Sequence, residues 1–149
     1  MQRWGQRAVA EGQEVTDLVA SGRRAAREVA RALVVAGAVN DQAFAEARSA
    51  RLARAGRSRR AIASHLAAKG VGSEVADPVL PDASDELPAA LAYARRRRIG
   101  PFRATPDDAA ALRDMGALAR AGFSRDIAER ALAMPIDEAE ALVIELKRG

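Results

Sequence analysis

The 149-residue sequence contains no cysteine and a single histidine, His65. Disulfide bonds and thiolate zinc sites are therefore excluded, and a histidine-rich metal centre is not expected. Aromatic residues make up only 3% of the chain, and valine and isoleucine are few and scattered, so the residues that favour strands are scarce. Alanine, the strongest helix former, is abundant. These proportions predict an all-α protein.

Long apolar runs are also missing. The longest one, residues 32–39, is too short to cross a bilayer. Residues 1–17 alternate charged and polar side chains and lack the apolar region of a secretory signal. We therefore expect a cytoplasmic protein.

Motifs typical of enzymes are absent as well. There is no P-loop, no Gly-x-Gly-x-x-Gly element and no spacing typical of metal ligands. Helix capping explains the carboxylates Asp107 and Asp108. Ser64 and His65 are neighbours on an expected helix, where adjacent side chains diverge, so they do not form a catalytic dyad. We expect no enzymatic activity, no metal and no cofactor.

The charge is unevenly distributed, although the formal net charge is only +4. Residues 24–70 carry ten basic and three acidic side chains, residues 71–90 carry five acidic and no basic ones, and residues 91–103 carry five arginines and no acid. Nearly all basic residues are arginine, whose planar fork suits phosphate and carboxylate. A high genomic GC content could explain that choice but not the clustering. The pattern predicts a surface that faces a polyanion.

Apolar spacing and capping residues predict a series of short helices. We expect helices over residues 24–36, 42–55, 59–69, 86–99, 106–121, 125–133 and 138–148, a short helical turn over 73–80, and a linker over 82–88. The expected ends are Gly37, Gly56, Gly70 and Gly122, and the expected N-caps are Asn40 or Asp41, Ser58, Thr105, Ser124 and Asp137. The expected core includes Val29, Leu33, Phe44, Ala47, Leu52, Ile62, Leu66, Leu91, Leu112, Met115, Leu118, Ile127 and Leu132.

One segment of the chain is repeated. Residues 52–59 and 118–125 differ only at the residue after the glycine. Each contains the end of a helix, a glycine, one variable residue and a serine that caps the next helix, which indicates tandem three-helix units. We expect a poorly matched segment over 1–23, a three-helix repeat over 24–81, a second repeat over 82–134 and a C-terminal helix over 135–149.

Two features point to phosphate or protein contact. The helix that begins at Arg57-Ser58-Arg59-Arg60 combines free backbone N–H groups with three guanidinium groups. Ile62 and Leu66 leave this helix little room to read bases, so backbone or protein-surface contact is favoured. The run Arg95–Arg98, at a helix C-terminus, is either a solvated run or a cluster that binds phosphate or acidic groups.

Arg48 lies on the apolar stripe between Phe44 and Leu52. It either extends along this stripe and pairs with Asp41 or Glu46, or contacts a partner.

The stretch from Gly37 to Ala47, followed by Arg48, Arg51, Gly56, Ile62, Leu66 and Lys69-Gly70-Val71, resembles the RecX regulatory proteins. Residues 90–103 and 118–132 resemble later parts of the same family. The resemblance implies tandem three-helix repeats in an elongated, curved array. It also implies a bacterial cytoplasmic protein that lies in the groove of the RecA–single-stranded-DNA filament, inhibits strand exchange and ATP hydrolysis, and promotes filament disassembly in the SOS response.

The chain departs from the family pattern at two places. Asn40 replaces an aspartate and caps equally well, whereas residues 1–22 show no first-repeat pattern. We expect a monomer that binds the filament, or alternatively a stand-alone DNA-binding protein or a scaffold for an acidic partner. The candidate filament- or DNA-binding residues are Arg48, Arg51, Arg57, Arg59, Arg60, Lys69, Arg95, Arg96, Arg97 and Arg98.

Overall fold

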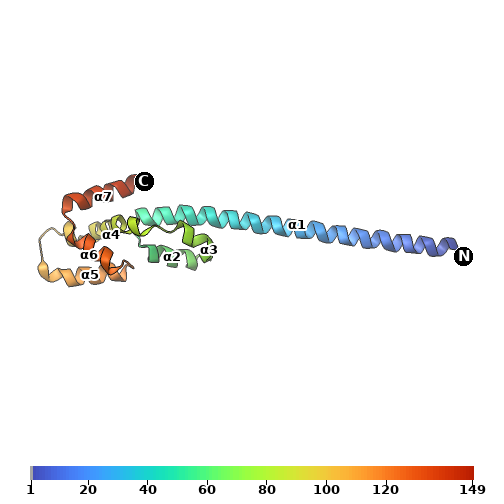
Figure 1. Ribbon diagram of the computed structural model, residues 1–149, viewed down its shortest axis with the longest axis horizontal. Helices are drawn as coiled ribbons and strands as arrows, with labels where there is room; N and C mark the ends of the chain where they lie inside the picture. Colours follow the sequence, from blue (N-terminus) through green and yellow to red (C-terminus); the bar gives the residue numbers. More distant parts are fainter. Residues whose placement is uncertain (1) are drawn as a thin grey trace. The chain divides into compact units, whose positions relative to one another are not determined.

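A computed structural model describes residues 2–149, with side chains from residue 9 onward (Figure 1). Its elements are α1 (Gln2–Arg54), α2 (Arg59–Ala68), α3 (Ser73–Ala76), the 3₁₀ turn η1 (Asp77–Val79), α4 (Ala83–Arg97), the 3₁₀ turns η2 (Gly100–Phe102) and η3 (Asp108–Ala110), α5 (Ala111–Arg120), α6 (Arg125–Ala133) and α7 (Ile136–Arg148). Residues 2–149 contain no strand, which confirms the predicted all-α fold. None of these helices is both long and apolar enough to span a membrane.

The chain divides into two compact units, Met1–Asn40 and Asp41–Gly149. The predicted helix end at Gly37 and the cap at Asn40 or Asp41 are wrong, because α1 continues through all three residues. Gly37 does not adopt the left-handed conformation that ends a helix. A single glycine inside a helix costs only about 1 kcal/mol relative to alanine, so it does not by itself stop the helix.

The first unit is a single helical segment whose side chains are exposed. Every residue from 9 to 40 is exposed. Val29 and Leu33, which we expected in a core, are 59% and 68% exposed. The amphipathic spacing correctly indicated a helix, but this helix has no core of its own.

The second unit begins with a small core formed by the end of α1, by α2 and by the segment up to Leu80. Its buried members are Ala45, Ile62, Leu66, Val71, Ala76 and Leu80, and Phe44 and Leu52 pack against them. The buried Ser49 donates a hydrogen bond of 2.6 Å to the carbonyl of Val79, which ties α1 to η1. Ala47 is exposed rather than part of the core.

A larger core lies among α4, α5, α6 and α7. Leu91, Leu118, Ile127 and Val143 are buried there. The predicted linker over 82–88 is wrong, because α4 starts at Ala83 and contains Pro88. Proline has no N–H, so Pro88 removes one intrahelical hydrogen bond, near the start of the helix. The rest of α4 still buries its apolar face.

Two other helix starts differ from the prediction. Asp107 rather than Thr105 provides the cap, since its side chain accepts a hydrogen bond from the N–H of Ala109. Leu112, which we expected in the core, is 84% exposed. The last helix is capped at Pro135, not at Asp137. The repeat boundaries at residues 24–81 and 82–134, and the curved array, stay predictions.

Candidate functional site

The repeated sequence segment forms the same turn twice within the second unit. Gly56 and Gly122 both have positive φ, +83° and +96°, which ends the preceding helix in the left-handed conformation. Two residues later, Ser58 and Ser124 have almost identical extended backbones and each accepts a hydrogen bond from a backbone N–H of the next helix. The predicted glycine ends and serine caps are confirmed.

The two turns are in contact with each other. The Ser58 hydroxyl donates a hydrogen bond of 2.7 Å to the carbonyl of Ala121 and accepts one of 3.1 Å from the N–H of Ala61. Gly122 permits this contact, because a Cβ added there would lie 2.5 Å from the Ser58 hydroxyl oxygen. Gly56 in turn approaches α4, where an added Cβ would lie 3.0 Å from the backbone nitrogen of Tyr93. These close approaches fix α2, α4 and α5 relative to one another.

An open cleft of about 280 Å³ lies beside these turns. Arg57 from the first turn, Arg97 from the end of α4 and Arg120 from the end of α5 line it, and Tyr93 provides an aromatic side chain. We call this site the arginine cleft. The remaining lining residues are Gly56, Ala117 and Ala121, so among the residues that line it there is no carboxylate. Three cations without a counter-charge make the cleft suited to an anion such as a phosphodiester.

A second depression adjoins the arginine cleft. It measures about 390 Å³, is lined by Arg60, Ser64 and Arg120 among others, and shares Arg120 and Ala121 with the first. Arg120 therefore lies between the two. The positive surface thus extends from Arg97 to Arg60, across the two interlocked turns.

Arg96 and Arg97 both contact Tyr93 but differ in their other interactions. Their guanidinium carbons lie 5.8 and 5.4 Å from the ring centroid, within the range of cation–π contacts. Arg96 also donates a hydrogen bond of 2.8 Å to the carbonyl of Ala55, at the C-terminal end of α1. A cation at this position stabilises the helix end, so Arg96 has a structural role.

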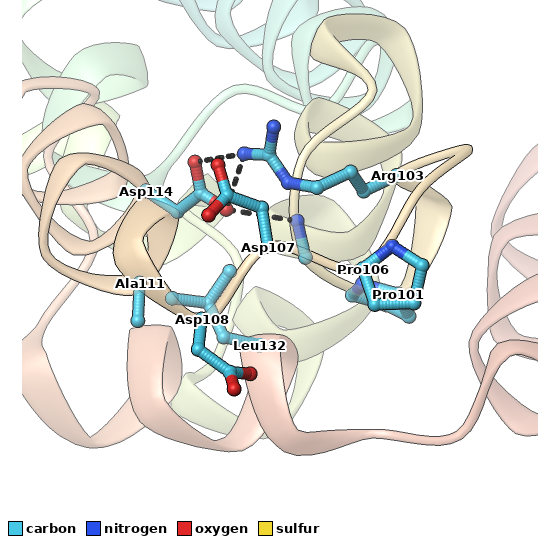
Figure 2. A pocket seen from close by; sticks show the side chains of 9 residues that line it. Pro101, Arg103, Pro106, Asp107, Asp108, Ala111, Asp114 and Leu132 are labelled. Carbon is cyan, nitrogen blue, oxygen red and sulfur yellow. Dashed lines mark hydrogen bonds and ion pairs between the residues drawn. The ribbon is translucent and has the colours of Figure 1, made fainter.

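Another pocket, of about 320 Å³, contains a buried ion pair (Figure 2). Asp114 is 5% exposed and accepts hydrogen bonds of 2.7 and 2.9 Å from Arg103, and a third of 3.1 Å from the N–H of Gly100. Asp107 and Asp108 also line this pocket, and Figure 2 shows the carboxylate of Asp108 pointing away from the pair. The Asp114 carboxylate is occupied by these three bonds, so it holds the loop after α4 against α5. From residue 2 to residue 149, no group of three His, Cys, Asp or Glu residues could hold a metal ion.

Comparison of the sequence with known proteins finds a matching family model and two relatives. Residues 40–80 match the family model described as "RecX, second three-helix domain". The chain is 43% identical over 105 residues to "Regulatory protein RecX" of Myxococcus xanthus (strain DK1622), covering 67% of this chain and 56% of that protein. This chain is a relative of the RecX regulatory proteins.

A second alignment supports the relation. "Regulatory protein RecX" of Agrobacterium fabrum (strain C58 / ATCC 33970) is 38% identical over 107 residues, which cover 71% of this chain and 58% of that protein. The resemblance indicated by the sequence motifs is therefore confirmed. The chain spans little more than half the length of either RecX protein. No solved structure matches the chain significantly.

Six of the ten predicted binding residues lie within the matched RecX domain, on α1, α2 or the turns that follow these helices. Arg48 is half-buried and its guanidinium carbon lies 5.2 Å from the centroid of the Phe44 ring. In the described part of the chain it forms no ion pair with Asp41 or Glu46. Arg51 and Lys69 are exposed. These three residues do not line the arginine cleft.

Arg59 has a different environment from Arg57 and Arg60. Its guanidinium donates a hydrogen bond of 2.7 Å to the carbonyl of Pro81, and its backbone N–H donates one of 2.8 Å to Glu86. Arg59 therefore helps to attach the start of α2 to the start of α4. Its counterpart in the second turn, Arg125, is paired with Glu129, and this hydrogen-bonded carboxylate raises the pKa of Arg125.

The run Arg95–Arg98 diverges around the end of α4, and only Arg97 lines the arginine cleft. Arg98 adopts the left-handed conformation, with φ of 55°, and ends the helix. All four are exposed. Among the residues that the structure describes, the ion pairs involve other arginines and none of the ten predicted residues.

Arg120 is the cleft residue that our sequence-based prediction missed. It precedes the second Gly-x-Ser turn, at the position that Arg54 occupies before the first turn. The repeat shows that position 120 lies at a helix end. The convergence of Arg120 with Arg57 and Arg97 depends on how the two turns pack, which the sequence does not specify.

Proposed function

We propose that this chain is a regulatory protein of the bacterial cytoplasm that binds the RecA–single-stranded-DNA filament and inhibits the recombinase's ATP hydrolysis and strand exchange. It would act in DNA repair and the SOS response by binding, not by catalysis. Its relation to the RecX proteins supports the choice of partner. The observation that carries the proposal is the arginine cleft, which is lined by three arginines and by no carboxylate.

The chemistry of the cleft fits the nucleic-acid component of such a filament. A phosphodiester accepts hydrogen bonds from guanidinium groups in a planar, two-pronged arrangement. Arg57, Arg97 and Arg120 come from three different elements that close backbone contacts hold together. Little conformational freedom of these elements would therefore be lost on binding, which favours affinity.

The test is the single-stranded-DNA-stimulated ATPase of purified RecA, titrated with this protein. The proposal predicts that ATP turnover falls as the protein approaches the concentration of filament sites. The combined variant Arg57→Gln, Arg97→Gln and Arg120→Gln should lose at least tenfold in potency, because each lost phosphate contact weakens binding.

The matched control is the combined variant Arg113→Gln, Arg130→Gln and Arg148→Gln. It removes the same net charge from exposed positions that do not line the cleft. Equal loss of potency in both variants would show that net charge, not the cleft, matters. No inhibition by the unaltered protein at several-fold excess would reject the proposal.

A second candidate function is stand-alone DNA binding, favoured by Arg60 in the adjoining depression, which extends the positive surface along α2. This alternative predicts that the protein binds labelled single-stranded DNA without RecA, with an affinity that falls steeply as salt rises. Fluorescence anisotropy at several salt concentrations separates the two functions. Absence of binding without RecA would leave only the first.

A further inference from the structure

Gly116 lies in the middle of α5, where the backbone has no need of glycine. It does not have a positive φ, and glycine inside a regular helix is less favourable than alanine. A Cβ added to Gly116 would lie 3.1 Å from Nη1 of Arg120 and 3.9 Å from its Cζ. In the described part of the chain, no other atom beyond the backbone of α5 and the adjacent residues lies within 4 Å of that Cβ. The Arg120 guanidinium therefore occupies the space that a side chain at residue 116 would need.

Helix geometry explains why these two residues meet. A long side chain on a helix points toward the N-terminal end of that helix, over the residue four positions earlier. Because Gly116 has no side chain, the guanidinium of Arg120 can lie against the surface of α5. From there Arg120 lines both the arginine cleft and the adjoining depression. Among the residues that the structure describes, no ion pair holds Arg120 in this place.

The repeated segment provides an internal comparison. In the first turn, Ala50 stands at the position of Gly116 and Arg54 at the position of Arg120. Arg54 is exposed and lines neither the arginine cleft nor the adjoining depression. The arginine that lines a cleft is thus the one that has a glycine four residues before it.

We propose that Gly116 is a positioning residue of the arginine cleft, because it lets the Arg120 guanidinium lie along α5 and meet a phosphate together with Arg57 and Arg97. This role rests on the proposed function, since it adds a residue to the same site. A larger residue at position 116 would lift the guanidinium off the helix and away from the cleft. Glycine weakens the helix at this position, and a loss of stability in exchange for a placed functional group is common at binding sites.

Titration with inorganic pyrophosphate tests the role of Gly116 without RecA or DNA. Binding is followed by NMR through the Nε–Hε signals of the arginines. Gly116→Leu should raise the dissociation constant about tenfold, because loss of a hydrogen bond to a charged group has an effect of this order. Gly116→Ala should raise it less, because the guanidinium then has to move by only a few tenths of an ångström.

Thermal unfolding of the same variants separates positioning from a merely structural role. Gly116→Ala should raise the midpoint of unfolding, since alanine is the better helix former, while it weakens pyrophosphate binding. A glycine that the fold requires would instead give a lower midpoint. Opposite effects on stability and binding are therefore expected only if Gly116 acts on the site.

Two further variants serve as controls. Ala50→Leu places the same side chain at the equivalent position of the first turn and should leave the dissociation constant unchanged, because Arg54 lines neither depression. Gly116→Leu combined with Arg120→Gln should bind pyrophosphate no more weakly than Arg120→Gln alone, because Gly116 acts through Arg120.

Three results would overturn the role of Gly116. These are unchanged affinity in Gly116→Leu, a further loss when this substitution is added to Arg120→Gln, and arginine signals of the unaltered protein that do not shift even at millimolar pyrophosphate. The RecA ATPase measured with the same variants tests the proposed function separately. Pyrophosphate binding that depends on Gly116, without inhibition of RecA, would reject the proposed function and leave the role of Gly116 intact.

Discussion

The hydroxyl oxygen of Ser58 occupies the space that a side chain at Gly122 would need. An ideal Cβ on Gly122 would lie 2.5 Å from this oxygen. The hydroxyl is itself held by its hydrogen bonds to Ala121 and Ala61. The second of the two matching turns is thus packed directly on the cap of the first, and the arginine cleft lies beside this contact.

Gly122→Ala should therefore destabilise the protein for two reasons. The left-handed φ of +96° is unfavourable for alanine, at about 1–2 kcal/mol, and the methyl group would displace Ser58. Gly70→Ala is the matched control, because Gly70 has φ of +82° but nothing within 4 Å of an added Cβ. Urea unfolding of both variants measures the difference. Equal losses of stability would mean that the contact with Ser58 adds nothing.

Ser58→Ala should be more destabilising than Ser124→Ala. Both serines cap a helix, and loss of a cap typically costs about 1 kcal/mol. Ser58 is 1% exposed and also bonds to the carbonyl of Ala121, so its replacement should cost roughly 1–3 kcal/mol. Thermal denaturation monitored by circular dichroism compares the two. A larger effect for Ser124→Ala would contradict this account of the interlocked turns.

Arg96→Ala and Arg97→Ala should affect different properties, the first the stability of the fold and the second the binding of anions. Both arginines contact Tyr93, but only Arg96 bonds to the carbonyl of Ala55. Loss of Arg96 should lower the free energy of unfolding by about 1 kcal/mol, whereas loss of Arg97 should leave stability nearly unchanged and weaken anion binding. Denaturant unfolding and DNA-binding assays on each variant would test this division. A stability loss confined to Arg97→Ala would contradict the structural role given to Arg96 and the binding role given to Arg97.

Asp114→Ala should destabilise the protein more than removal of an exposed ion pair. Arg103 is left partly buried without its partner, and the N–H of Gly100 loses its acceptor. Loss of one partner of a fully buried ion pair typically costs about 3–5 kcal/mol of unfolding free energy. The cost should be lower for Asp114→Ala, because the Arg103 side chain is 25% exposed. Glu129→Ala breaks the exposed pair with Arg125 and should cost less than about 1 kcal/mol. Comparable losses in the two variants would show that Asp114 is not structurally important.

Local features of the fold could be predicted from the sequence. The glycines at 56 and 122 and the serines that follow them define turns through their own backbone and side-chain preferences, and both turns are present. The break at Gly37 was wrong, because glycine permits a left-handed conformation without requiring it. Leu112 was misplaced because Asp114, an unexpected inward-facing charge, meets Arg103 on the buried side of α5.

The candidate site could be predicted only in part. Arg57 and Arg97 were identified from charge clustering, because charge is visible residue by residue. Their convergence with Arg120 depends on contacts between segments more than twenty residues apart, such as that between Ser58 and Ala121. Local sequence patterns do not encode such distances, so the sequence indicated the type of surface but not its geometry.

The most direct test of the central claim is the RecA ATPase on single-stranded DNA, measured with the unaltered protein, with the Arg57, Arg97 and Arg120 variant, and with the control variant at Arg113, Arg130 and Arg148. We predict inhibition by the unaltered protein and by the control, and at least a tenfold loss of potency in the cleft variant. Full inhibition by the cleft variant would contradict the claim that the arginine cleft binds the filament.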